Sequence, residues 1–240
     1  MSQTESLFIE NGIDPLLAEV PLDLKMGHSR QSDSDHPELR TFISRVFRKH
    51  HGAEITSFYP NLIGFQTEGR LQAVVGYRDW NADAFFSEQY LSTPVEHLAT
   101  ELLGQPVARE ELAEVGNLAI SDPGQARWVI SASTEFLAAA GYRWVMFTAT
   151  RPLANAFGRL GLKPMRLAEA DPARLPDQGA SWGDYYTGAP QVYLGDIHAG
   201  RTKLHGHAQR HDRLHRLLGA ARELAKETQA PAAAVAGIQA

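Results

Sequence analysis

The sequence predicts an α/β (α+β) fold, in which helices flank a central β-sheet. Segments with helical spacing of apolar residues alternate with short runs of strand-forming residues. Two of these runs are joined by a hairpin signal at 68–70, and a nearly continuous apolar run at 144–150 fits a strand covered on both faces. With 240 residues, of which 43% are hydrophobic, the chain has enough material for one medium-sized domain with tails.

Composition excludes several classes of function. The formal net charge of -5 argues against a general nucleic-acid binder, whose phosphate contacts need an excess of basic residues. There are no cysteines, so disulfides, thiolate metal sites and a cysteine nucleophile are excluded. The first residues include Glu5 and Glu10, with no basic start and no apolar run long enough for a signal segment or a membrane span. We therefore expect a cytoplasmic protein with no bound metal and no integral membrane span.

The chain divides into three parts. We expect 1–36 to be an N-terminal arm outside the core, with a short apolar patch from Ile13 to Leu24 broken by prolines. Residues 37–200 form the catalytic domain, and 201–240 form a basic, histidine-rich and then alanine-rich tail with one helix at 204–226. Periodicity and cap residues predict the elements of the domain. They are helices at 37–52, 93–103, 128–140 and 152–160, and strands at 61–67, 71–78, 113–120, 144–150, 163–168 and 191–195.

The rest of the chain is organised around the stretch Ala113-Glu114-Val115-Gly116-Asn117-Leu118-Ala119-Ile120. Gly116-Asn117 interrupts the alternation of strand-forming residues, which is typical of a bulge or of close backbone approach by a ligand. The glycine-bearing loop 121–127 follows and opens a helix, where unpaired N–H groups attract an anion. A phosphate-bearing donor next to the Glu114 carboxylate suits acyl transfer to an amine.

The order of elements over 37–195 resembles the GNAT superfamily of N-acyltransferases. The run 155–164, with Asn155, Phe157 and Gly161-Leu162-Lys163-Pro164, looks like the helix and "GF.P" segment that flanks the pantetheine arm in that superfamily. The stretch at Glu114 is similar to the glutamate-bearing fourth strand of acyl-homoserine-lactone synthases. Together with Phe147-Thr148-Ala149-Thr150, it resembles the thermostable hemolysin family. The resemblance implies a mixed, mostly antiparallel sheet with a splayed central strand pair, and a fatty-acyl thioester donor with no permanently bound cofactor.

The loop at 121–127 departs from this resemblance. Coenzyme A users of the superfamily carry [QR]-x-x-G-x-[GA] there, whereas Asp122-Pro123-Gly124-Gln125-Ala126-Arg127 has one glycine and an acidic residue. The donor is therefore left open between coenzyme A and an acyl carrier protein. For a carrier protein, the nearest basic residues are Arg127, Arg143, Arg151 and Arg159.

The candidate catalytic residues are Glu114, Asn117 and Tyr186. Glu114 is either the general base that deprotonates the acceptor ammonium or a carboxylate that holds a neighbouring arginine. Asn117 either binds the acceptor or holds the bulge through side-chain bonds to the backbone. Tyr186 is a candidate to protonate the leaving thiolate, and Tyr185-Tyr186 is either a lid or ordinary packing.

The candidate binding residues fall into a donor set and a substrate set. For the donor we expect Leu118, Ala119, Ile120, Gly124, Arg127, Asn155 and Phe157, where backbone N–H groups near Leu118 and Ile120 polarise the thioester carbonyl. For the substrates we expect Arg78, Trp80, Phe147 and Thr148. Arg78 and Trp80 recognise an acceptor carboxylate or a carrier surface, or belong to an ordinary surface ion pair. Phe147 and Phe157, with Trp128 and Met146, form either an acyl tunnel or plain core.

The sequence thus predicts an N-acyltransferase that moves a fatty acyl group from acyl carrier protein or coenzyme A to a small amine such as an amino acid. Two alternatives remain. One is a membrane-active, hemolytic protein, for which Leu214, Leu217 and Leu218 offer a narrow apolar stripe on the basic helix. The other is a non-catalytic acyl-binding module on the same fold.

Overall fold

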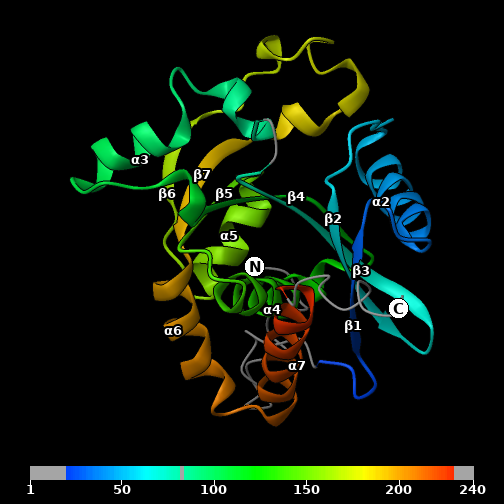
Figure 1. Ribbon diagram of the computed structural model, residues 1–240. Helices are drawn as coiled ribbons and strands as arrows, with labels where there is room; N and C mark the ends of the chain where they lie inside the picture. The colour runs from blue at the N-terminus through cyan, green and yellow to red at the C-terminus, as the bar shows by residue number, and fades with distance from the viewer. Residues whose placement is uncertain (1–19, 82–83, 230–240) are drawn as a thin grey trace, which may run out of the picture.

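The computed structural model describes residues 20–81 and 84–229. Seven strands form one sheet in the order β1-β2-β3-β4-β5-β7-β6 (Figure 1). The strands are β1 (Lys25–Arg30), β2 (Asn61–Thr67), β3 (Arg70–Asp79), β4 (Leu112–Ile120), β5 (Trp144–Ala149), β6 (Met165–Glu169) and β7 (Gln191–Asp196). The helices are α2 (His36–His51), α3 (Val95–Leu103), α4 (Ala126–Ala139), α5 (Arg151–Arg159), α6 (Ile197–Ala208) and α7 (Asp212–Gln229).

The central strand pair is splayed, as predicted. All neighbouring strands are antiparallel except β4 and β5, which are parallel. Their pairing runs only from Leu112 opposite Trp144 to Val115 opposite Phe147, although β4 continues to Ile120. The sheet therefore opens beyond Val115, and side chains from both faces can meet in the opening.

The helix ends predicted from glycines are confirmed. Gly52 and Gly104 follow α2 and α3 in the left-handed conformation, with φ of 63° and 66°. Glycine adopts this conformation without the steric penalty of a Cβ atom. The hairpin is confirmed in the same way, because Glu68 and Gly69 both have positive φ between β2 and β3.

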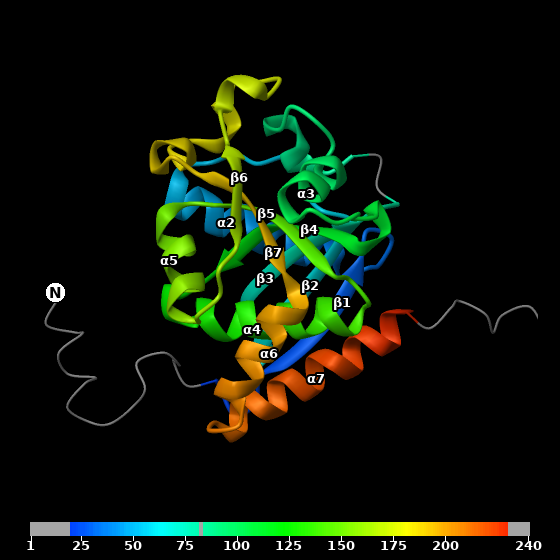
Figure 2. The same cartoon turned by 90° about the vertical axis from the view of Figure 1, so that its left-hand side faces the viewer.

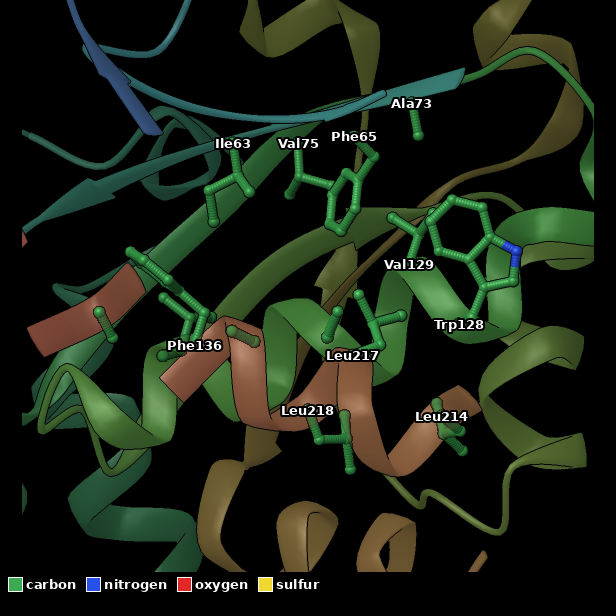
Figure 3. Packing of buried hydrophobic residues seen from close by; sticks show 14 of the residues in the cluster. Ile63, Phe65, Ala73, Val75, Trp128, Val129, Phe136, Leu214, Leu217 and Leu218 are labelled. Atoms are coloured by element: carbon green, nitrogen blue, oxygen red, sulfur yellow. The ribbon is translucent and has the colours of Figure 1, made fainter. Parts of the chain in front are cut away.

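Helices cover both faces of the sheet (Figure 2). On one face, α2 packs through Leu39 and Ile43, and α3 packs through Val95. On the other face, α4 and α7 bury a second cluster that includes Phe65, Trp128 and Phe136 (Figure 3). Alternation along β5 directs Phe147 to the α4 side and Thr148 to the α3 side.

The N-terminal part adds to the sheet, which corrects the expectation of an arm outside the core. Lys25–Arg30 pairs antiparallel with β2 as edge strand β1, and Val20 belongs to the main core cluster. The strand KMGHSR is polar and contains glycine, so it carries no apolar alternation to detect. Ile13 and the rest of 1–19 lie outside the described residues, as do Glu5 and Glu10.

The basic tail is also different from the prediction. Residues 204–226 do not form one helix, because α6 ends at Ala208 and α7 begins at Asp212. The apolar stripe of Leu214, Leu217 and Leu218 is buried against α4 instead of facing solvent. The alanine-rich end from 230 lies outside the described residues.

A buried carboxylate explains how α6 and α7 are attached to α4. Glu135 on α4 is 1% exposed and accepts hydrogen bonds from Arg201 and His205 on α6 and from Arg222 on α7, at 2.7–3.1 Å. Burial opposes ionisation, but these three partners hold the pKa of Glu135 below its usual range. The cationic residues of the tail thus hold three helices together.

Candidate active site

A cavity of about 1070 Å³ passes through the opening between β4 and β5. On the α4 side it is lined by Leu118, Ile120, Val145, Phe147 and Phe157. On the α2 and α3 side its walls include Tyr59, Ser87, Thr148 and Tyr186. The volume lies slightly above the usual range of about 300–1,000 Å³ for small-molecule sites, which fits two reactants that meet in the middle.

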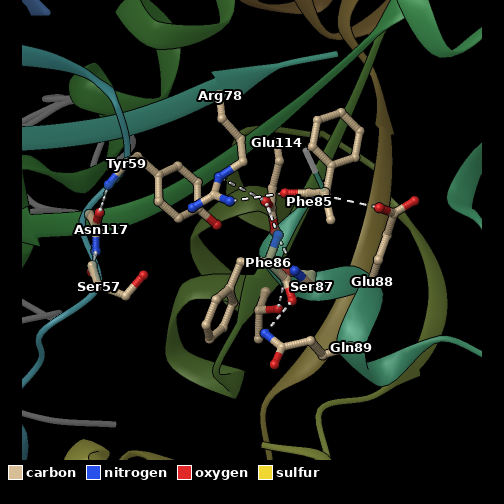
Figure 4. A network of polar contacts seen from close by, with 12 residues as sticks. Ser57, Tyr59, Arg78, Phe85, Phe86, Ser87, Glu88, Gln89, Glu114 and Asn117 are labelled. Atoms are coloured by element: carbon tan, nitrogen blue, oxygen red, sulfur yellow. Dashed lines mark hydrogen bonds and ion pairs between the residues drawn. The ribbon is translucent and has the colours of Figure 1, made fainter. Parts of the chain in front are cut away.

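Glu114 lies beside this cavity as a fully buried carboxylate. Its two oxygens accept the backbone N–H groups of Phe86 and Ser87, both at 2.6 Å, and the Nε of Arg78 lies 3.5 Å away (Figure 4). Burial raises the pKa of Glu114 above its usual range, although the hydrogen bonds from Ser87 and Phe86 and the positive charge of Arg78 act in the opposite direction. The arginine partner weighed from the sequence is therefore present.

The bonds to Glu114 hold a short 3₁₀ helix, η1 (Phe86–Tyr90), against the sheet. A second acidic anchor secures its other side, since Glu88 accepts the N–H groups of Phe85 and Val95. Arg109 holds Glu88 in a bidentate ion pair at 2.8 and 2.9 Å. This double anchor gives the cavity wall at η1 a fixed position.

Asn117 holds the bulge through its side chain. It has a positive φ of 47°, and its Oδ1 accepts the Tyr59 N–H at 2.8 Å while its Nδ2 donates to the Ser57 carbonyl. The Tyr59 ring lies directly over Gly116, where an added Cβ would come within 2.6 Å of the ring. Arg78 covers the same ring at 4.2 Å from its centroid. Gly116 thus permits the aromatic ring to pack on the strand.

Hydroxyl pairs line the cavity next to η1. The Tyr90 and Tyr186 hydroxyls are 2.5 Å apart, and the Ser87 and Thr148 hydroxyls are 2.9 Å apart. Burial raises the pKa of Tyr186 to about 12, so the phenol is protonated at neutral pH. Tyr186 therefore lines the cavity as a neutral phenol and not as a phenolate.

In the loop before α4, an acidic side chain of the loop itself binds a backbone N–H group. The Asp122 carboxylate accepts the Gly124 N–H at 2.9 Å. In this position it satisfies a donor that a phosphate would otherwise use, and it adds negative charge at the helix start. Basic residues line the same side of the cavity farther along, namely Arg127, Arg159, Lys163 and Lys203.

The structure brings most of the predicted site residues to this cavity. Those that line it are Asn117, Leu118, Ile120, Gly124, Arg127, Phe147, Thr148, Asn155, Phe157 and Tyr186. Ala119 is fully buried against α2 on the other side of the strand. Arg78 lies behind Tyr59 and Glu114, and Trp80 is 43% exposed, so neither they nor Glu114 belong to the cavity lining.

Several lining residues were not predicted. They are Tyr59, Phe86, Ser87 and Tyr90, together with Phe47, His50 and His51 at the end of α2, and Trp182. η1 (Phe86–Tyr90) is held in place by contacts with Glu114 and Glu88, and such contacts do not appear in the sequence as periodicity. The run Trp182-Gly183-Asp184-Tyr185-Tyr186 was a usable signal, because so many aromatic residues are unusual in a glycine-bearing loop.

No cluster of three or more His, Asp or Glu side chains in 20–81 and 84–229 has the arrangement of a metal site. Within the same ranges, no helix has the length and apolar character needed to cross a bilayer.

Comparison with protein families identifies the chain. The thermostable hemolysin family matches residues 29–201. The chain belongs to the thermostable hemolysin family. Comparison with curated proteins gives no match.

Three solved structures that share this fold are an N-acyl amino acid synthase and two acyl-homoserine-lactone synthases. FeeM, an N-acyl amino acid synthase from uncultured soil microbes, has a TM-score of 0.53 and 12% identity, over 75% of this chain and 95% of that chain. The acyl-homoserine-lactone synthase LasI has a TM-score of 0.52 and 11% identity, over 76% and 95%. The coenzyme-A-dependent acyl-homoserine-lactone synthase BjaI has a TM-score of 0.51 and 14% identity, over 81% and 98%. This member of the thermostable hemolysin family therefore has the GNAT-like fold predicted from its sequence.

Proposed function

We propose that this protein is an N-acyltransferase that moves a fatty acyl group from a thioester donor to the amine of a small acceptor. The observation that carries the proposal is the cavity through the splayed pair β4 and β5, which has an apolar wall on one face and the buried Glu114 carboxylate next to its lining on the other. FeeM and the acyl-homoserine-lactone synthases, which share the fold, are synthases of acylated amines.

In the proposed reaction the acceptor nitrogen attacks the thioester carbonyl carbon. The C–N bond forms, the tetrahedral intermediate collapses, and the C–S bond breaks to give an amide and a thiol. The segment of β4 from Gly116 to Ile120 has no pairing with β5, so its backbone N–H groups on that side can polarise the carbonyl oxygen.

Glu114 is the proposed acceptor of the proton lost by the amine. Its raised pKa suits a base, and burial is the first cause of the rise. Because Glu114 does not line the cavity, we propose that the proton passes through Tyr59, a lining residue whose hydroxyl interacts with the Glu114 carboxylate. Burial and the Glu114 carboxylate both raise the pKa of Tyr59, so this hydroxyl stays protonated and can relay a proton.

Tyr186 is the proposed donor of the proton that the leaving thiolate needs. It lines the cavity and remains protonated at neutral pH, and Tyr90 is a hydrogen-bond partner at 2.5 Å. Asn117 acts through Tyr59, since its side chain holds the Tyr59 backbone over the bulge.

We propose acyl carrier protein as the preferred donor. Asp122 occupies the loop that would hold the coenzyme A pyrophosphate. A carrier protein needs no such loop, and its acidic surface would meet Arg127, Arg151 and Arg159 around the α4 and α5 side. Arg143 is less suited, since it pairs with Asp196 at the opposite end of β5 from Arg151.

The Tyr59→Phe variant tests the proton path. It removes one hydroxyl and keeps the ring between Gly116 and Arg78, so the fold should be retained. We expect a fall in kcat with acyl carrier protein on the order of a hundredfold, the lower end for a lost acid–base group. Unchanged kcat would remove Tyr59 from the path.

Direct lysis of membranes, the alternative that the family name suggests, receives less support from the structure. The stripe of Leu214, Leu217 and Leu218 that this alternative relied on is part of the core. An acylated product of the enzyme would account for hemolysis without insertion of the protein. Dye release from anionic liposomes by the protein alone, with no donor, would favour lysis.

A further inference from the structure

The two halves of the cavity differ in chemistry. The half on the α4 side is mainly aliphatic, with Leu118, Ile120, Val129, Ile130 and Leu162 among its walls. These side chains surround a flexible hydrocarbon without demanding a particular ring orientation. This half suits the acyl chain of the donor.

The half on the α2 side is built from aromatic rings. Trp182 is at the centre, with ring centroids 5.4–6.2 Å from those of Phe47, Phe86, Tyr185 and Tyr186. These rings come from α2, from η1 and from the loop 180–188, and all of them line the cavity. Their faces and edges favour a flat ring in offset or edge-on contact.

The loop that carries Trp182 is clamped to α2. The Asp184 N–H donates to the His51 carbonyl at 2.9 Å, the Asp184 carboxylate meets the His51 imidazole at 3.1 Å, and the Glu54 N–H donates to the Ser181 carbonyl at 2.7 Å. Gly183 has a φ of 57°, and an added Cβ would lie 1.9 Å from the His51 oxygen. The ring arrangement is therefore a preformed site.

The aromatic half holds no described Arg or Lys side chain for an acceptor carboxylate; His50 and His51 line it at the end of α2, and His51 already meets the Asp184 carboxylate. Among the described lining residues, the Arg and Lys side chains are Arg127, Arg159, Lys163 and Lys203, and all of them lie on the α4, α5 and α6 side. Arg78 is already paired with Glu114. An ammonium group, in contrast, is attracted by the negative faces of the rings that line this half.

We infer that the aromatic half is the acceptor subsite, and that it takes a primary amine attached to an aromatic ring by a short chain, with no carboxylate required. This inference rests on the proposed acyl transfer, and it proposes Trp182 and its neighbouring rings as the acceptor-binding residues in place of Arg78 and Trp80, the residues expected from the sequence.

Calorimetric titration of the full chain without a donor tests the inference. The probes are phenethylamine, cyclohexylethylamine, which lacks the aromatic ring, and phenylalanine, which adds a carboxylate. We expect phenethylamine to bind about tenfold more tightly than cyclohexylethylamine, since ring contacts with Trp182 would supply about 1.4 kcal/mol, and also more tightly than phenylalanine, because the aromatic half holds no Arg or Lys partner for the added carboxylate. Equal or tighter binding of phenylalanine or cyclohexylethylamine would overturn the inference.

Two tryptophan variants locate the site. Trp182→Leu should weaken phenethylamine binding about tenfold, whereas the exposed Trp80→Leu should leave it unchanged. The reverse pattern would contradict the assignment. If circular dichroism shows that Trp182→Leu does not fold, the relative affinities of the three probes for the natural chain still test the inference.

Binding of phenethylamine, measured together with amide formation from acyl thioesters, separates the inference from the proposed function. Phenethylamine that binds as expected but gives no amide with any thioester would refute acyl transfer and retain the amine site. Amides formed from other amines, with no binding of phenethylamine, would refute the aromatic acceptor site and retain acyl transfer.

Discussion

Gly116→Ala is the substitution whose effect follows most directly from the structure. The added Cβ would lie 2.6 Å from the Cζ and hydroxyl oxygen of Tyr59, a distance that real Cβ atoms do not reach. The ring cannot simply swing away, because Tyr59 is 5% exposed and Arg78 covers it at 4.2 Å. The methyl group must displace either the ring or the strand at the bulge.

The expected cost is that of overpacking a core position, about 1–3 kcal/mol. In a protein of 240 residues, each kcal/mol lowers Tm by about 2–4 °C. Catalysis should fall further than stability, by on the order of a hundredfold, because a displacement of about 1 Å is enough to misplace reacting groups. Urea denaturation and the acyl-transfer assay measure the two effects.

Gly27→Ala is the matched control, since Gly27 is also in a strand and an added Cβ there meets nothing within 4 Å. It should stay within about 0.5 kcal/mol of the natural chain. In a double variant that combines Gly116→Ala with Tyr59→Ala, the clash is absent. Its loss of stability should therefore be smaller than the sum of the losses in the two single variants. Equal stability of Gly116→Ala and the natural chain would refute the packing of Tyr59 on Gly116.

Three further predictions concern other parts of the molecule. Glu135→Gln should cost about 1.5–3 kcal/mol at neutral pH, the range for hydrogen bonds to a charged group. Because the folded pKa of Glu135 is lowered, its contribution to the free energy of unfolding is present above the unfolded pKa and is lost as pH falls through the folded pKa. In urea denaturation at a series of pH values, the free energy of unfolding of the variant should therefore decrease less steeply toward acid pH than that of the natural chain. An identical decrease in both proteins would contradict this. Tyr186→Phe should lower kcat about a hundredfold with KM nearly unchanged in steady-state assays, and unchanged kcat would exclude Tyr186 as the acid. Arg127→Glu and Arg151→Glu should weaken carrier-protein binding and reduce its salt dependence, whereas saturation by acyl-coenzyme A at low micromolar concentration with carrier binding unaffected would refute the donor preference.

The sequence predicted the elements from α2 to β7 because each has a local signal. Helical spacing and the glycines at 52 and 104 give the bounds of α2 and α3, and the glutamate-bearing strand with its bulge is visible as an interrupted alternation. Edge strand β1 has no such signal, since its residues are polar and only its pairing with β2 makes it a strand. The break between α6 and α7 contains neither glycine nor proline, so a single helix fitted the pattern equally well.

The site was only partly predictable, for a related reason. Glu114 and Asn117 stand out within one strand, but their partners Phe86, Ser87 and Tyr59 are 27–58 residues away and are brought near by the fold. The aromatic half combines α2, η1 and the loop 180–188, and no short stretch of sequence contains it. Whether Glu114 acts as the base stays a prediction.

The measurement that tests the central claim most directly is product formation by the purified full chain. Fatty acyl carrier protein and acyl-coenzyme A are each incubated with a panel of amines that includes phenethylamine, and products are identified by mass spectrometry. The account predicts an N-acyl amide and one equivalent of free thiol, with faster turnover from the carrier protein and loss of turnover in the Tyr59→Phe variant. Absence of amide with every donor and amine, combined with dye release from liposomes by the protein alone, would contradict it.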